Sequence, residues 1–147
     1  MARELPSLPY HGTEGISGSQ IIRARGFHAE AGQFCHRCVE AVIEAAIADR
    51  GEAILDNLKN PHGQRRDKFR RLWLGSGSPL TKEEQEELTT ILSLMALRGS
   101  SMDRDTVTYV DYARATPPTI EPTISAAMIR MARRFYRIVR PQLTSIP

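Results

Sequence analysis

The sequence has few cysteines, few lysines and no long apolar run. Its 147 residues include two cysteines and one tryptophan, whereas a secreted domain held by disulfides carries more cysteines, spread further along the chain. The longest apolar stretch, residues 91–97, is much shorter than the roughly 20 residues of a membrane-spanning helix. The first six residues contain an acid and a proline, which is unlike a signal peptide. We expect a cytoplasmic or virion protein that is neither secreted nor embedded in a membrane.

The composition excludes a disordered chain. Apolar residues make up 41% and charged residues 25% of the sequence, which is enough for one packed domain. We predict a single compact all-α domain of five to six helices over residues 19–140. An extended arm, rich in proline and glycine, precedes it at 1–18, and a short C-terminal tail follows at 141–147. Residues 104–113 fit either a helix or a strand, and we favour a helix because no partner strand is evident.

Two helices, with a shorter piece at 52–59 between them, are predicted in the first half of the chain. Apolar residues recur at spacings of three and four from Gly26 onward, in a helix that starts near Ser19. Gly51 is placed to end it. The Asn-Pro-His-Gly sequence at 60–63 is predicted to break the helical pattern, and a short helix follows over 64–74.

Two further helices are predicted in the second half. Thr81 and Glu84 have the spacing of a capping box, in which each side chain accepts a hydrogen bond from the other residue's backbone N–H. That helix is expected to run to about Arg98. The last helix, over 123–140, has the clearest pattern, with an apolar stripe opposite an arginine stripe. Pro141 is predicted to end it.

Basic charge is concentrated in two segments. The chain carries 17 arginines and three lysines, yet its net charge is only +3. Residues 61–78 and 121–147 each carry +4, whereas residues 27–60 and 79–120 each carry −3. Arginine suits phosphate because its planar fork matches two phosphate oxygens. The candidate nucleic-acid-binding residues are Arg65, Arg66, Lys68, Arg70, Arg71, Arg130, Arg133, Arg134, Arg137 and Arg140.

We interpret these two clusters as a surface for single-stranded RNA or DNA, lining a shared groove. Aromatic residues lie within both clusters and can stack on bases, but their apolar spacing places Phe69, Trp73 and Phe135 in the core. The alternating charge blocks and extended ends suit contacts between identical subunits. The leading hypothesis is a non-enzymatic, self-assembling subunit of a coat or nucleoprotein. The alternatives are a helical adaptor that binds another protein, a small enzyme, and a solvated charged face whose acidic and basic blocks pair with one another inside one folded domain.

The sequence carries no recognisable catalytic or cofactor motif. Cys35 and Cys38 form a CxxC pair, and thiolates at this spacing bind zinc when a second half-site completes the tetrahedron. No second half-site occurs, and cysteines three apart on an apolar helix face are also typical of core packing. We therefore predict no catalytic residue, metal or cofactor, with a zinc site at Cys35 and Cys38 as the alternative.

Overall fold

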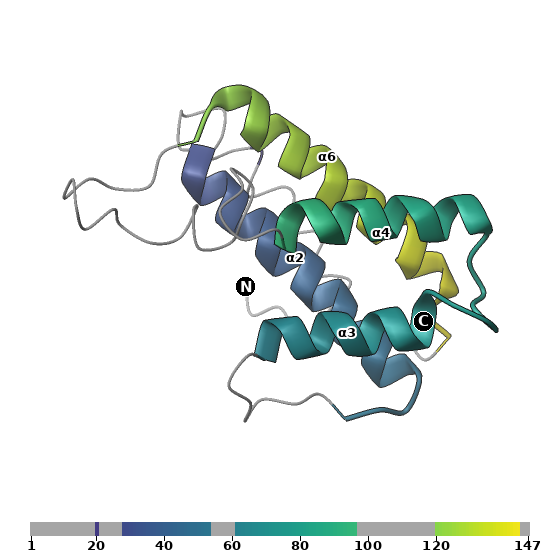
Figure 1. The fold of residues 1–147 in the computed structure, drawn as a ribbon. Helices are drawn as coiled ribbons and strands as arrows, with labels where there is room; N and C mark the ends of the chain where they lie inside the picture. Colours follow the sequence, from purple (N-terminus) through teal and green to yellow (C-terminus); the bar gives the residue numbers. More distant parts are fainter. Residues whose placement is uncertain (1–19, 21–27, 54–60, 97–119, 145–147) are drawn as a thin grey trace, which may run out of the picture.

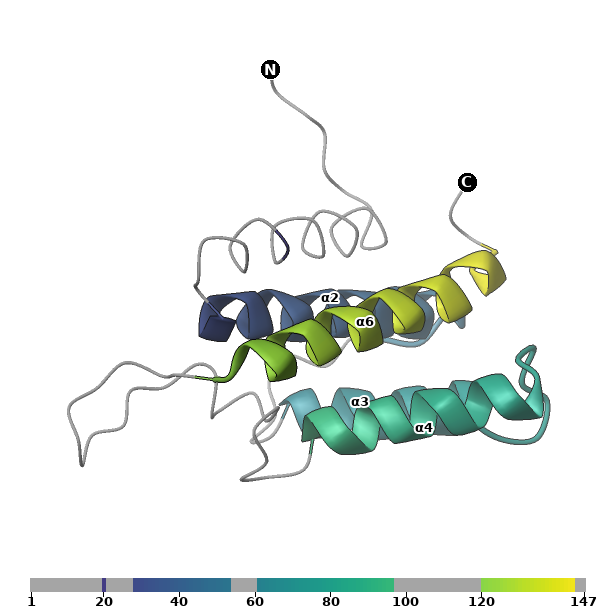
Figure 2. The same cartoon turned by 90° about the horizontal axis from the view of Figure 1, so that it is seen from above.

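The computed structural model describes residues 20, 28–53, 61–96 and 120–144, and in this part of the chain the protein is all-α. Four α-helices form two layers that cross obliquely (Figures 1 and 2). One layer pairs the parallel helices α2 and α6, and the other pairs the antiparallel helices α3 and α4. The helices are α2 (His28–Asp49), α3 (Pro61–Trp73), α4 (Lys82–Ala96) and α6 (Pro122–Val139), followed by a 3-10 turn, η1 (Arg140–Gln142).

The core lies between the two layers and contains an aromatic cluster. The Phe69 ring, on α3, lies with its centroid 6.2 Å from that of Trp73 and 5.3 Å from that of Phe135 on α6. All three side chains are fully buried, as the apolar spacing predicts. Trp73 Nε1 donates a hydrogen bond of 3.0 Å to the carbonyl oxygen of Ala46 on α2, and the Arg50 guanidinium lies 4.5 Å from its ring centroid. These two contacts of Trp73 join the C-terminal ends of α2 and α3.

The predicted helix signals at Gly51 and Thr81 are confirmed. Gly51 has a φ of 72°, a left-handed conformation that glycine adopts without steric cost, and its N–H bonds to the carbonyl oxygen of Ala48. At the start of α4, the Thr81 N–H donates to Glu84 Oε2 at 2.9 Å, and the Glu84 N–H donates to Thr81 Oγ1 at 3.2 Å. These reciprocal bonds satisfy backbone donors that a helix start leaves free.

One predicted boundary is wrong. Residues 61–63, expected to break the chain, form the first turn of α3. Proline is compatible with a first turn because its missing N–H has no partner there in any case. The prediction that the last helix ends at Pro141 is confirmed to within a residue or two, because α6 ends at Val139 and a single 3-10 turn, η1, follows it. The segment beyond it is partly packed, because Leu143 is buried and the Thr144 N–H bonds to Asp49 Oδ1 at 2.8 Å.

Several predictions lie outside the described residues. They are the arm at 1–18, the helix start near Ser19, the chain from 97 to 119 with its ambiguous segment 104–113, and the end of the tail. The prediction of five to six helices includes these segments, so the helix count stays a prediction.

Candidate nucleic-acid interface

The basic residues of α3 are largely neutralised within the fold. Arg65 donates to Glu44 on α2 at 2.9 Å, and its side chain is 14% exposed. Lys68 Nζ lies 3.1 Å from a Glu52 carboxylate oxygen and donates to the Ala53 carbonyl at 3.0 Å, with 15% of its side chain exposed. These contacts fasten α3 to the end of α2, and they leave little of either cation for a ligand.

The remaining basic residues of α3 also have partners. Arg70 bonds to Asp67 one turn earlier at 3.0 Å. Arg71 is 61% exposed and lies 3.8 Å from Glu52, which also contacts Lys68. Arg66 is half-buried and takes part in an interaction of its own. Ion pairs of this kind add little stability at exposed positions, but they reduce the positive potential of the α3 surface.

The arginines of α6 form a different environment. Within the described part of the chain, Arg130, Arg133 and Arg137 make no ion pair and no side-chain hydrogen bond. Arg130 and Arg137 are exposed, and Arg133 is half-exposed. Their spacing of three and four residues places them along one side of the helix, opposite the buried stripe that includes Met128, Ala132 and Phe135. Arg140, at the end of the helix, is half-buried and interacts with its surroundings.

Arg134 differs from its neighbours because it pairs with an acid on α4. Its Nε and Nη2 atoms donate to the two carboxylate oxygens of Glu87 at 2.7 and 2.8 Å. This bidentate geometry is the strongest form of a guanidinium–carboxylate contact. The Arg134 hydrogen bonds lower the pKa of Glu87 below its ordinary 4.5, and those bonds in turn raise the pKa of Arg134. Both side chains remain substantially exposed.

The described contacts do not bring the two basic clusters together in a shared groove. Arg65 and Lys68 of the α3 cluster pair with acids on and just after α2, whereas Arg134 of the α6 cluster pairs with Glu87 on α4. The aromatic residues in these clusters do not form an open stacking surface either, because Phe69, Trp73 and Phe135 are buried and Tyr136 is half-buried against the core. Arg130, Arg133 and Arg137 on α6 are therefore the predicted cations that have no acidic partner among the described residues.

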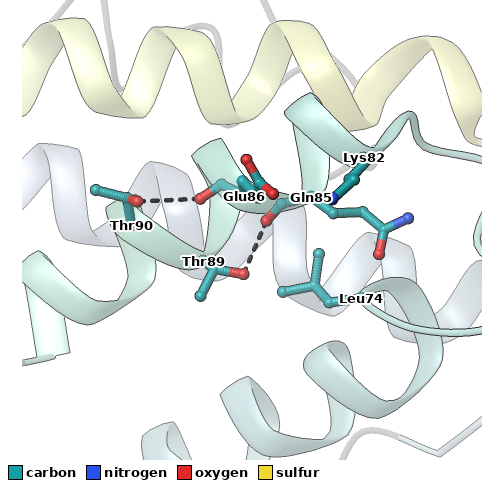
Figure 3. Close-up of a pocket in the computed structure, with 6 residues that line it drawn as sticks. All are labelled: Leu74, Lys82, Gln85, Glu86, Thr89 and Thr90. Atoms are coloured by element: carbon teal, nitrogen blue, oxygen red, sulfur yellow. Dashed lines mark hydrogen bonds between the residues drawn. The ribbon is translucent and has the colours of Figure 1, made fainter.

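Two open clefts flank α4. One lies beside the turn that connects α3 to α4 and is lined by Leu74, Lys82, Gln85, Glu86, Thr89 and Thr90 (Figure 3). Its threonine hydroxyls donate to carbonyls of α4 itself, Thr89 to Gln85 and Thr90 to Glu86. The other cleft lies between α4 and α6, has a volume of about 310 Å³ and is mostly apolar. It is lined by Glu87, Thr90, Ile91, Arg130, Met131 and Arg134.

The two cysteines pack in the core of α2. Cys35 and Cys38 are both buried and unlinked. Burial, with a smaller contribution from Cys35, raises the pKa of the Cys38 thiol to about 12. A zinc ligand must be a thiolate, so this environment disfavours metal binding. Among the described residues, no three histidine, cysteine or acidic side chains are grouped so that they hold a metal ion.

Sequence reasoning missed the acids that divide the basic residues into paired and unpaired. Glu44, Glu52 and Glu87 each lie at least 16 residues along the chain from the basic residues that they pair with. No local spacing signals such a partner. The apolar lining of the α4–α6 cleft includes Ile91 and Met131. The spacing of apolar residues within one helix cannot predict this cleft, because each residue belongs to the core-facing stripe of its own helix.

Comparisons with known protein families, with curated proteins and with solved structures found no match to this chain. Within the described residues, no helix is both long enough and apolar enough to cross a membrane.

Proposed function

We propose that this protein is a non-enzymatic nucleic-acid-binding subunit that contacts phosphates through α6. The observation that carries the proposal is the set of arginines on α6, Arg130, Arg133 and Arg137, which have no acidic partner among the described residues. Unpaired cations on a solvated helix face attract phosphate, and binding gains free energy from the counterions it releases. The α3 cluster, in this proposal, mainly holds helices together.

The proposal also includes self-assembly. The solvent-facing side of α4 exposes Glu83 and Glu86, which make no ion pair with the described residues, and α6 exposes arginines. A subunit with faces of opposite charge can contact a second copy through them, and such contacts, when repeated, build rings or filaments. A coat or nucleoprotein subunit combines this assembly with a basic surface turned toward the packaged strand.

The test is the binding of labelled 12-nucleotide RNA and DNA by the full-length protein, followed by fluorescence anisotropy. We expect binding that weakens steeply with salt, and we expect Arg133→Glu combined with Arg137→Glu to abolish it. Absence of salt-sensitive binding to any of these oligonucleotides would contradict the proposal. Light scattering during size-exclusion chromatography, with and without nuclease, tests assembly, and a discrete monomer in both runs would refute that part.

A further inference from the structure

The cleft between α4 and α6 combines an apolar floor with a cationic edge. Ile91 and Met131 supply apolar surface from the two helices, and the accessible lining is mostly apolar. Arg130 stands at the edge with no ion pair to the described residues. Arg134 stands beside it, with its guanidinium held by Glu87.

This combination fits a flat, weakly polar group that is attached to an anion. The polarisable sulfur of methionine makes favourable contacts with aromatic rings, and a guanidinium plane stacks on bases as well as binding phosphate. A volume of about 310 Å³ lies at the lower end of the range for small-ligand pockets, which suits one small group better than a packed protein helix. The charged residues of the lining, Glu87, Arg130 and Arg134, sum to +1, which favours an anionic partner.

We propose that this cleft receives one unpaired base of a single-stranded nucleic acid while Arg130 contacts an adjacent phosphate. The inference rests on the proposed function and names the form of nucleic acid that it takes. A base in a duplex is paired and stacked, so it cannot enter a cleft between two helices, whereas a base of a single strand can be turned outward. The cleft therefore makes the protein selective for single strands, beyond the general attraction of the α6 arginines.

Two neighbouring threonines of α4 provide a matched test. Both are exposed, and both donate their hydroxyl to a carbonyl one turn earlier (Figure 3). Thr90 lines both clefts, whereas Thr89 lines only the cleft beside the α3–α4 turn and not the α4–α6 cleft. Thr90→Glu and Thr89→Glu thus change the net charge and the helix equally, but only Thr90→Glu places a carboxylate at the proposed base site.

The probes are 12-nucleotide oligo-U and oligo-dT, each free and as a duplex with its complement, bound to the full-length protein at one fixed salt concentration. We expect the wild type to bind the single strands at least tenfold more tightly than the duplexes. We expect Thr90→Glu to weaken single-strand binding at least tenfold and Thr89→Glu to weaken it less than threefold. Met131→Gln, which removes apolar surface without adding charge, is expected to reduce the single-strand preference with little change in duplex affinity.

The possible failures are distinguishable. If the wild type binds no oligonucleotide, the proposed function itself fails. If it binds duplexes as tightly as single strands, or if Thr89→Glu and Thr90→Glu lose equal affinity, the α6 surface binds phosphate but the cleft takes no base. If Thr90→Glu changes the oligomeric state in light scattering and leaves oligonucleotide binding intact, a second copy of the chain occupies the cleft and the inference is overturned. Equal thermal unfolding curves by circular dichroism verify that both variants are folded.

Discussion

The division between paired and unpaired cations predicts a specific salt dependence. Arg130 and Arg137 are seven residues apart on α6, which corresponds to about 10 Å along the helix. Arg130, Arg133 and Arg137 lie within this length, and each can neutralise one phosphate of a strand that runs along the face. Three neutralised phosphates on a single strand give a slope of about −2 in a plot of log K against log salt. The affinity should then fall about twentyfold between 50 and 200 mM salt.

Alanine variants separate the two clusters. Arg130→Ala, Arg133→Ala and Arg137→Ala should each make the slope shallower by about 0.7, and the triple variant should bind with almost no salt dependence. Arg65→Ala is the matched control, because it removes the same charge from the chain but from a side chain already bonded to Glu44. It should leave the slope within about 0.3 of the wild type and instead lower the free energy of unfolding.

The assay is fluorescence anisotropy with oligo-U and oligo-dT at four or more salt concentrations, with urea unfolding of each variant measured in parallel. The reasoning is refuted if Arg65→Ala reduces the slope as much as the α6 variants do. It is also refuted if the triple α6 variant keeps the wild-type slope, since the phosphate contacts would then lie elsewhere on the protein.

Further predictions follow from single contacts. Glu87→Gln should release the Arg134 fork and steepen the salt slope by about 0.7, measured in the same titrations; an unchanged slope would show that Arg134 does not reach phosphate. Thr81→Ala should lower the free energy of unfolding by about 1 kcal/mol through loss of the α4 cap, measured by urea unfolding, and no loss would argue against the capping box. Trp73→Phe should cost about 1–3 kcal/mol, because it leaves a buried carbonyl of α2 without its donor; a stability equal to the wild type would mean that water replaces the indole. Because the pKa of the Cys38 thiol is about 12 rather than the ordinary 9.0, the unfolded chain releases this proton at lower pH than the folded protein does. Stability should therefore fall as pH rises from 9 toward 12, and Cys38→Ala should flatten that fall in pH-dependent unfolding.

Local patterns account for much of the fold. The Thr81–Glu84 box and the apolar stripe of α6 depend on residues three or four apart, and both are found where the spacing predicts them. The prediction at Pro61 is wrong because proline marks a break in one context and a helix start in another, and the outcome depends on where α3 packs. A short-range pattern cannot make that distinction.

The candidate site is less visible in the sequence. The spacing of the α6 arginines identifies one polar side of a helix, and the structure shows that side to be exposed at Arg130 and Arg137. The alternating charge blocks allow acidic and basic residues to pair inside the domain, but they do not identify which cations are paired, and the α3 and α6 segments carry equal charge. Arg65 and Glu44 are 21 residues apart, and Arg134 and Glu87 are 47 apart, so these pairings arise from tertiary packing.

The contact between α2 and α3 contains an intrinsic fluorophore. Its single tryptophan, Trp73, is enclosed in the core, bonded to α2 and covered by the Arg50 guanidinium. Indole emission shifts to longer wavelength when water reaches the ring, so intrinsic fluorescence reports directly when α3 separates from α2. A label-free signal of this kind follows the detachment of one helix pair, whereas circular dichroism follows the loss of helix throughout the chain. Coincident curves from the two measurements would show that the two layers come apart in a single cooperative step.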